Sequence, residues 1–351
     1  MRIALIKTSS MGDVIHALPV VTDLHAARPD VVIDWVVEES FADLPRLHPG
    51  VADIIPVAIR RWRRNWFSAA SRAERRQVRE RLAAARYDLV LDLQGLVKSA
   101  LVARWARGPR AGFSFRCARE PVAALFYQHR YDVDMSRHAI ERLRELAGAA
   151  VGTPHDALPV FGLRAPTPAA TGLESPAGGQ PCAVLLHATS RAEKQWPDAS
   201  WNTLIDRLAD AGLVSVLPWG SEGEREAAQR LAAGHPRAMV APRMSLAQCA
   251  ALLASARCVV GVDTGLTHLA CALDVPTVAL FAATPAWRFG PYWTERAAGL
   301  GEDGRWPEPD AVMAALAGVG GFDEVRESAG VRESGGAGGA GGHAGVDGPE
   351  P

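Results

Sequence analysis

A carboxylate at the start of a predicted helix is the first feature of this chain that suits chemistry. The segment K-T-S-S-M-G-D, residues 7–13, follows an apolar run at 3–6 and precedes another at 14–18. This pattern predicts a strand, a turn of small residues and a helix that begins near Asp13. Asp13 then either caps the helix or faces a ligand, as a general base would. The turn alone does not separate these interpretations.

Two segments of the second half carry residue types that bind phosphate. In L-L-H-A-T-S-R-A-E-K-Q-W-P, residues 185–197, the hydroxyls of Thr189 and Ser190 precede Lys194. Hydroxyls, loop N–H groups and one lysine suit the oxygens of a diphosphate. The alternative is an ordinary strand-to-helix loop with a solvated lysine.

The second such segment is C-V-V-G-V-D-T-G-L-T-H-L-A, residues 258–270. Asp263, Thr264 and Gly265 stand at the predicted start of a helix, and His268 lies one turn into it. A helix N-terminus attracts anions, which favours a ligand site. The alternative is a capped helix with a packed histidine.

Two weaker signals lie between these segments. L-P-W-G-S-E-G-E, residues 217–224, ends a strand in a glycine turn, where the carboxylate of Glu224 could accept hydrogen bonds from sugar hydroxyls. In P-R-M-S-L, Met244 precedes Ser245, a predicted N-cap. Exposed acids at helix starts and packing methionines are common, so neither segment identifies a site by itself.

The first half contains a concentrated basic and aromatic segment, V-A-I-R-R-W-R-R-N-W-F-S-A, at residues 57–69. Its charged and aromatic residues are Arg60, Arg61, Arg63, Arg64, Trp62, Trp66 and Phe67. The spacing is not that of one helix face, so a salt-bridged helix explains it poorly. Arginines suit phosphate or carboxylate groups, and aromatics suit an amphiphile or a membrane surface. Lys98, in L-Q-G-L-V-K-S, and Arg119, in C-A-R-E-P, are further candidates for the same anion-binding surface.

Length and composition bound the class of protein. The 351 residues fit two domains, and 48% apolar with 22% charged residues are typical of a soluble globular protein. No apolar run reaches a membrane span, and the N-terminus lacks a signal-peptide pattern. The five cysteines are at least nine positions apart, which predicts reduced thiols in a cytoplasm rather than a disulfide framework or a zinc site.

Charge is distributed unevenly between the two halves. Residues 1–150 hold 24 Lys and Arg against 17 Asp and Glu, whereas residues 151–351 hold 14 against 22. A basic first half is expected to meet an anionic partner. The pI near 6.8, together with the lack of a basic stripe in the second half, argues against nucleic acid.

Strand-like and helix-like patterns alternate through both halves, which predicts an α/β fold with parallel sheets and helical crossovers. The expected strands are 2–7, 31–37, 52–57, 88–92, 111–115, 182–188, 213–218, 237–241, 257–262 and 276–281. The expected helices are 13–27, 38–46, 70–86, 96–107, 136–149, 198–211, 221–233, 245–256, 265–273 and 308–318. Two such halves place a ligand between the carboxyl ends of their sheets.

The expected organisation has four parts. Residues 1–155 form an N-terminal domain, 156–181 a linker rich in Pro, Gly, Thr and Ala, and 182–319 a C-terminal domain. Residues 320–351 contain eleven glycines in 32 positions and few apolar side chains, which predicts a disordered tail.

Taken together and in order, these motifs closely resemble the lipopolysaccharide heptosyltransferases of glycosyltransferase family 9. The motifs are K-T-S-S-M-G-D, D-W-V-V-E-E, V-A-I-R-R-W-R, D-L-Q-G-L-V-K-S, A-R-E-P, L-H-A-T, L-P-W-G and V-D-T-G-L-T-H-L, from residue 1 to about 280. The charged motif I-R-R-W-R-R favours the first heptosyltransferase group over the second. Beyond residue 280 the resemblance fades, since A-A-T-P-A-W-R-F-G-P replaces a G-P-T-D-P-like segment.

The resemblance implies a GT-B fold of two Rossmann-like domains facing a central cleft. It also implies inverting transfer of L-glycero-D-manno-heptose from ADP-heptose to a Kdo sugar of Kdo2–lipid A. The enzyme would act as a monomer, peripherally at the cytoplasmic face of the inner membrane.

The resemblance further implies a role for each matched residue. Asp13 is the expected general base, and Lys194 serves both catalysis and donor binding. The donor residues are Ser10, Thr189, Ser190, Lys194, Glu224, Met244, Asp263, Thr264, Gly265 and His268. The acceptor residues are Arg60, Arg61, Arg63, Arg64, Lys98 and Arg119. Ser190 stands where family members usually have Thr, which keeps the hydroxyl.

The residues of this chain argue against several alternative functions. A dehydrogenase would need G-x-G-x-x-G after the first strand, and S-S-M-G-D lacks its first two glycines. A sugar-nucleotide epimerase has no use for an Arg–Trp surface, and a non-enzymatic anion-binding protein leaves Asp13 without a purpose. Heptosyltransferase II, or another GT-B enzyme with a different acceptor, is the nearest alternative. The D-V-D triplet at 132–134 is expected to be surface, and no cofactor or obligatory metal is predicted.

Overall fold

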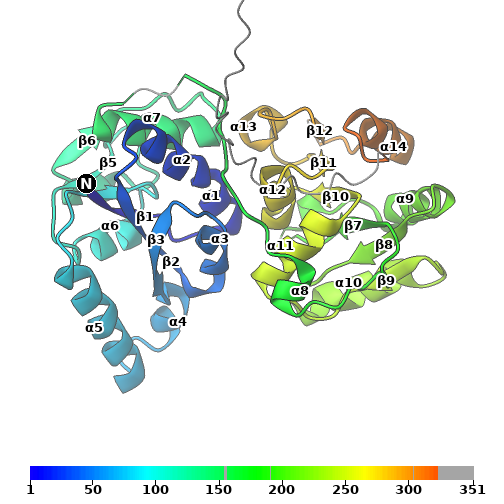
Figure 1. The fold of residues 1–351 in the computed structure, drawn as a ribbon, viewed down its shortest axis with the longest axis horizontal. Coiled ribbons are helices and arrows are strands. Elements are labelled where there is room, and N and C mark those ends of the chain that lie inside the picture. The colour runs from blue at the N-terminus through cyan, green and yellow to red at the C-terminus, as the bar shows by residue number, and fades with distance from the viewer. Residues whose placement is uncertain (154–155, 190, 303, 323–351) are drawn as a thin grey trace, which may run out of the picture.

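The computed structural model describes residues 1–153, 156–189, 191–302 and 304–322, which form two lobes side by side (Figure 1). The described residues of each lobe build one six-stranded sheet, in which every strand pair is parallel. Parallel strands joined by helices are the doubly wound architecture that the alternating pattern predicts. The α/β fold class is therefore confirmed.

The first lobe has the strand order β3-β2-β1-β4-β5-β6. Its strands are β1 (Arg2–Ile6), β2 (Val32–Glu38), β3 (Val51–Val57), β4 (Leu89–Asp92), β5 (Arg110–Phe113) and β6 (His129–Tyr131). Its helices are α1 (Met11–His16), α2 (Leu18–Ala27), η1 (Glu39–Phe41), α3 (Asp43–Arg46), α4 (Ile59–Arg64), α5 (Ala69–Ala84), α6 (Val97–Ala103), η2 (Pro121–Phe126) and α7 (Ala139–Val151). The central strand β1 is apolar after its first residue because both faces of the sheet are covered.

The second lobe has the strand order β12-β11-β10-β7-β8-β9. Its strands are β7 (Cys182–Leu186), β8 (Val214–Leu217), β9 (Ala238–Val240), β10 (Cys258–Val262), β11 (Thr277–Leu280) and β12 (Ala297–Leu300). Its helices are α8 (Pro168–Thr171), η3 (Ala192–Lys194), α9 (Asp198–Asp210), α10 (Glu222–Ala232), α11 (Leu246–Ser255), α12 (Gly265–Ala272), α13 (Ala286–Phe289) and α14 (Pro309–Gly318).

The structure differs from the sequence prediction mainly in short elements. The edge strands β6 and β12 were not predicted, because three or four residues such as His-Arg-Tyr carry no strand pattern. Residues 13–27 form two helices instead of one, since Pro19 lies in the first turn of α2 and starts it afresh. Residues 59–64 are helical, although their spacing had suggested otherwise.

The segment predicted as a linker runs from the end of α7 to the second lobe (Figure 1) and contains the single-turn helix α8. The division into domains at residues 155 and 181 stays a prediction. Of the predicted tail, 323–351 lie outside the described residues, and the last described helix ends at Gly318.

Helices α1 and α12 join the two lobes in close contact. A Cβ on Gly265 would lie 2.4 Å from Met11 Sδ, and a Cβ on Gly12 would lie 3.1 Å from His268 Cδ2. The buried apolar cluster that contains Leu5 of β1 also contains Leu269 of α12. The start of the helix after β1 therefore packs against the start of the helix after β10.

Both sheets reverse their strand order next to these helices. In the first sheet the order reverses between β1 and β4, and in the second between β10 and β7. Ligands of doubly wound sheets bind at the carboxyl ends of strands at such reversal points. We therefore expect a ligand site at the loops that follow these four strands.

Candidate functional site

Asp13 occupies the third position of α1, where it can both cap the helix and act as a general base. Its Oδ2 accepts hydrogen bonds from Ser10 N at 2.9 Å and from Ser10 Oγ at 2.6 Å, which is a capping box. Burial raises the pKa of Asp13, but Lys7 and the Ser10 hydrogen bonds lower it further, so the net pKa lies below the ordinary value. Asp13 caps the helix as an ionised carboxylate, the form in which a general base acts.

The turn that carries Asp13 is held by the loop after β4. Gln94 Oε1 accepts hydrogen bonds from Thr8 N at 2.8 Å and from Ser9 N at 3.1 Å. Lys98, a predicted acceptor residue, donates from Nζ to Ser9 Oγ at 3.1 Å. The two strands at the order reversal thus position one another's loops.

Lys7 lies beneath the same turn. Its Nζ donates to the Leu93 carbonyl at 3.0 Å and lies 3.8 Å from Asp13 Oδ1. Burial lowers the pKa of the Lys7 ammonium, and the nearby carboxylate opposes that shift. The first letter of the K-T-S-S-M-G-D motif is therefore the cation nearest the predicted base.

Asp13 lines a cavity of about 380 Å³ that also takes residues from the second lobe. Its cationic lining residues are Lys7, Arg119, Arg142 and Arg288. Asp13 is the single carboxylate among its described lining residues. Such a cavity suits a ligand that carries an anionic group close to the hydroxyl that loses its proton.

Sequence reasoning identified Arg119 but missed Lys7, Arg142 and Arg288 as members of this cavity. Arg142 stands on α7 outside every quoted motif, and Arg288 stands on α13, beyond the last quoted motif. The predicted arginines of α4 are not among the described residues that line it. Arg119 is thus the predicted acceptor residue that lines the same cavity as Asp13.

Three histidines lie between the lobes next to Asp13. The ring centroid of His16 is 4.6 Å from that of His268 and 5.9 Å from that of His138. Burial and the two neighbouring histidines hold the pKa of His16 well below its ordinary value. His16 is therefore neutral at physiological pH and adds no cation to the cavity.

In the second lobe, the carboxylate of Asp263 accepts hydrogen bonds from two predicted donor-binding residues. Lys194 Nζ donates to its Oδ2 at 2.5 Å, and His268 Nε2 donates to its Oδ1 at 3.1 Å. Thr284, which sequence reasoning missed, also donates to Oδ2. Burial raises the pKa of Asp263, but these partners lower it well below the ordinary range. The loops after β7 and β10 are thus joined by one ion pair.

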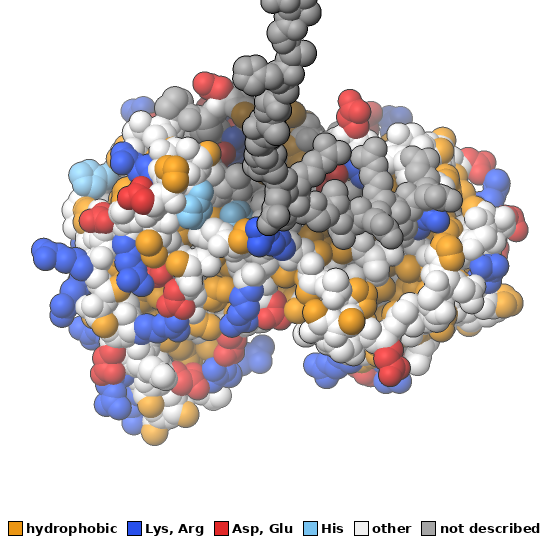
Figure 2. Space-filling model, viewed as in Figure 1, with side chains coloured by type: hydrophobic (Ala, Val, Ile, Leu, Met, Phe, Trp, Pro, Cys, Tyr) orange, Lys and Arg blue, Asp and Glu red, His pale blue; other side chains and the backbone are white. Residues whose placement is uncertain are grey.

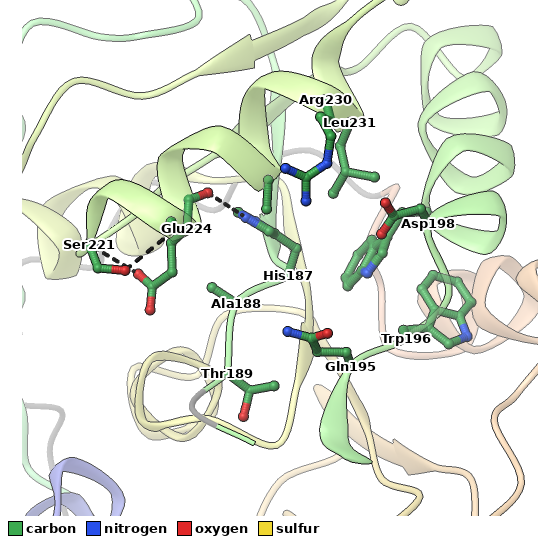
Figure 3. A pocket seen from close by; sticks show the side chains of 13 residues that line it. His187, Ala188, Thr189, Gln195, Trp196, Asp198, Ser221, Glu224, Arg230 and Leu231 are labelled. Carbon is green, nitrogen blue, oxygen red and sulfur yellow. Dashed lines mark hydrogen bonds between the residues drawn. The ribbon is translucent and has the colours of Figure 1, made fainter. Parts of the chain in front are cut away.

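The predicted residues Thr189 and Glu224 line a second cavity, of about 340 Å³, shown in Figure 3. Glu224 Oε2 accepts hydrogen bonds from Gly220 N at 2.7 Å and from Ser221 N at 3.1 Å, so it closes a capping box on α10. His187 Nε2 donates to the Glu224 carbonyl at 3.2 Å. Ser190 lies outside the described residues.

Three further predicted donor residues have individual surroundings. Thr264 is the N-cap of α12 and makes no side-chain capping hydrogen bond within the described chain. Met244 packs against the apolar cluster between the lobes. Gly265 is required by the close approach of Met11, which is a structural reason for this glycine that sequence reasoning did not foresee.

The basic segment at residues 57–69 is organised differently from the prediction. Arg61 forms ion pairs with Glu39 and Glu74, each at 2.9 Å, and Trp62 is buried with its Nε1 donating to Glu74 at 2.7 Å. The expectation that salt bridging explains this segment poorly is therefore wrong for Arg61. Arg60, Arg63 and Arg64 remain exposed.

Neither a metal-binding cluster nor a membrane-spanning helix occurs among the residues that the structure describes. Within these ranges, no group of three or more His, Cys, Asp or Glu is placed to hold a metal ion. Asp132 and Asp134 of the D-V-D triplet are exposed, as expected. None of the helices in the described part of the chain is long and apolar enough to cross a bilayer.

Comparison with known proteins relates this geometry to one family. Residues 75–317 match the model of glycosyltransferase family 9 (heptosyltransferase). Lipopolysaccharide heptosyltransferase 1 of Escherichia coli is 48% identical over 299 residues, which is 83% of this chain and 91% of that protein. Its counterpart in Pseudomonas aeruginosa is 48% identical over 294 residues, covering 83% of this chain and 81% of that protein.

Solved structures give the same relationship. The E. coli heptosyltransferase WaaC with ADP has a TM-score of 0.82 and 42% identity, covering 90% of this chain and 99% of that one. The same enzyme with ADP-2-deoxy-2-fluoro heptose has a TM-score of 0.79. A structure of E. coli heptosyltransferase II, at 24% identity and a TM-score of 0.74, shares the fold.

Proposed function

This chain belongs to glycosyltransferase family 9, and from that membership we propose that it transfers heptose from ADP-heptose to the inner core of lipopolysaccharide. The donor is ADP-L-glycero-β-D-manno-heptose, and the acceptor is a Kdo sugar of Kdo2–lipid A. Relatives named lipopolysaccharide heptosyltransferase 1 are 48% identical over most of their length. A related structure holds an ADP-heptose analogue, which supports the donor.

The observation that carries the mechanism is one ionised carboxylate facing a cationic cavity at the junction of the lobes. Inversion at the anomeric carbon needs an in-line attack by an acceptor hydroxyl, whose proton is removed as the new C–O bond forms. Asp13 is the carboxylate among the described lining residues of that cavity, and its low pKa keeps it ready to accept the proton. Because one base suffices, no carboxylate pair of the glycosidase kind is required.

Departure of ADP is assisted from the second lobe. Negative charge develops on the diphosphate as the C–O bond breaks, so a positive group nearby lowers the barrier. Lys194 and the N-terminus of α12 are the groups that fit this task, and Asp263 holds Lys194 in place through the ion pair. ADP leaves as a stable anion and needs no acid to protonate it.

The surface of the first lobe supports action at the cytoplasmic face of the inner membrane. Residues 60–81 contain nine arginines and two glutamates, and Figure 2 shows Lys and Arg side chains gathered where α4 and α5 lie. At the turn between these helices, Trp66 is 48% and Phe67 is 83% exposed. Exposed aromatics among arginines bind an anionic lipid surface.

This membrane proposal has a direct test. The double variant Trp66→Ser/Phe67→Ser is expected to lose sedimentation with phosphatidylglycerol vesicles. The matched control Leu158→Ser/Val160→Ser removes two side chains that are 61% and 58% exposed elsewhere on the chain and is expected to bind as the unmodified protein does. Equal loss in both variants, or equal binding to neutral vesicles, contradicts the proposal.

The function itself is tested with purified protein, ADP-heptose and Kdo2–lipid A. We expect ADP release and a product heavier by one heptose. Transfer only to an acceptor that already carries a heptose would instead indicate heptosyltransferase II. We also propose that the active species is a monomer, which light scattering at assay concentration checks.

A further inference from the structure

Two arginines from different lobes line the Asp13 cavity. Arg142 comes from α7 of the first lobe, and Arg288 comes from α13 of the second. Burial and the nearby Arg288 guanidinium together lower the pKa of Arg142. Two cations that line one cavity repel each other, and an anion bound between them would offset that repulsion.

The polar atoms of these arginines are only partly satisfied. Nε of Arg142 and Nε of Arg288 are both buried, and neither has a hydrogen-bond partner within the described residues. Buried polar groups normally form hydrogen bonds, so two buried Nε groups without partners suggest that a ligand binds there. A carboxylate or phosphate oxygen is the partner that a guanidinium fork binds best.

The placement of Arg142 follows from the way α7 meets the second lobe. His138, Glu141 and Arg142 are three and four positions apart, so they share one side of the helix. His138 Nε2 donates to the Gly290 carbonyl at 3.0 Å, and Tyr292 donates to Glu141. These contacts turn the same side of α7 toward residues 288–292, and so toward Arg288.

We propose that Arg142 and Arg288 form an anion subsite that binds the carboxylate of the acceptor sugar from both lobes at once. The subsite rests on the proposed function, in which the acceptor is an acidic sugar. Asp13 lines the same cavity, so one sugar can present its carboxylate to the arginines and its hydroxyl to the base. Neither Lys194 nor Glu224 is among the described residues that line this cavity, which separates it from the diphosphate side.

The subsite couples acceptor binding to the arrangement of the lobes. A carboxylate between the arginines replaces their repulsion by two attractions that reach across the junction. Acceptor binding then stabilises the arrangement in which Asp13 and the Asp263–Lys194 pair face the same junction.

Kinetics with each substrate varied in turn test the subsite. Arg288→Gln and Arg142→Gln are each expected to raise the KM for Kdo2–lipid A about 10- to 100-fold and to leave the KM for ADP-heptose unchanged. The control Arg137→Gln, on an exposed arginine two positions before α7 begins, is expected to change neither. A rise in the donor KM alone would show that Arg288 binds the diphosphate and would overturn the proposal.

A second readout separates binding of the carboxylate from a merely structural role. Free Kdo is expected to compete with the acceptor, whereas an analogue whose carboxylate is reduced to a hydroxymethyl group competes poorly. In Arg288→Gln this preference should largely disappear, and Arg288→Lys should restore part of it. The double variant is expected to lose less than the product of the two single losses, because both side chains hold one anion.

Failure of the subsite and failure of the proposed function give different results. If the unmodified enzyme does not use Kdo2–lipid A, the proposed function fails. If it does, but Arg288→Gln keeps its preference for the carboxylate over the hydroxymethyl analogue, the subsite is wrong. Thermal unfolding of each variant checks that the fold is retained.

Discussion

The two halves of the site treat charge in opposite ways. In the second lobe the charged groups satisfy one another, since Asp263 is paired with Lys194 and His268, and Glu224 closes a capping box. The Asp13 cavity has four cationic residues, three from the first lobe and Arg288 from the second, with Asp13 as its one carboxylate among the described lining residues.

This difference shows what each ligand has to do. Lys194 is already paired with Asp263, so the diphosphate competes with Asp263 for the Lys194 ammonium. A group without a partner gains one, so an acidic acceptor lowers the electrostatic cost of the cationic cavity. The donor side is organised in advance, whereas the acceptor side is completed by its ligand.

The largest effect is expected when Asp13, the proposed general base, is replaced. Asp13→Asn keeps an oxygen for the Ser10 hydrogen bonds but cannot accept a proton, so kcat is expected to fall about 1000-fold. ADP-heptose affinity, measured by calorimetry, should stay within a few-fold. Ser10→Ala weakens the cap without removing the base and serves as the control. If Ser10→Ala lowers kcat as much as Asp13→Asn, Asp13 acts only as a cap.

Lys194→Met tests the donor side of the site, in the second lobe. It removes the cation beside the diphosphate and leaves Asp263 with fewer partners, so kcat/KM for ADP-heptose is expected to fall about 100-fold. Initial rates at saturating acceptor measure this. Arg191→Gln, on a neighbouring exposed arginine paired with Glu193, should change little. A loss confined to the acceptor KM would reverse the assignment of the two sides.

Lys7→Met tests whether Lys7 lowers the pKa of Asp13, through the pH dependence of kcat/KM. The pKa of Asp13 lies below its ordinary value partly because of Lys7, so the base is ionised above that pKa and is lost as the pH falls through it. Without Lys7 the pKa of Asp13 rises, so the acid limb of kcat/KM moves to higher pH, which a pH–rate profile of both proteins measures. Superimposable pH profiles would mean that Lys7 does not act on the base.

The smallest expected effect concerns stability at the junction. Burial lowers the pKa of His138 to about 4, below the 6.5 of an unfolded histidine. Between these values the unfolded chain binds the additional proton, so the free energy of unfolding falls as the pH falls from 6.5 to 4. His138→Gln can still donate to Gly290 but does not titrate, and should flatten this dependence by about 1 to 2 kcal/mol. Urea unfolding at several pH values measures it, and parallel curves would contradict the assignment.

Local patterns predicted much of the fold and part of the site. Strand, turn and helix follow one another so closely around Asp13 and around Asp263 that periodicity and turn residues suffice. The edge strands β6 and β12 were missed because edge strands are short and carry little apolar pattern. The helical and salt-bridged state of residues 59–64 was missed because Glu39 and Glu74, the partners of Arg61, are far from it in sequence.

The sequence by itself determined the α/β architecture, the carboxylate at the start of α1 and the hydroxyl, lysine and D-T-G residues of the second lobe, because each depends on neighbours a few positions away. Only the tertiary structure decided that Arg142 and Arg288, 146 positions apart in the chain, line one cavity with Asp13. It also decided that Gly265 serves the contact with Met11. Packing of α7 against α13 and of α1 against α12 brings these residues together, and no local pattern records such packing.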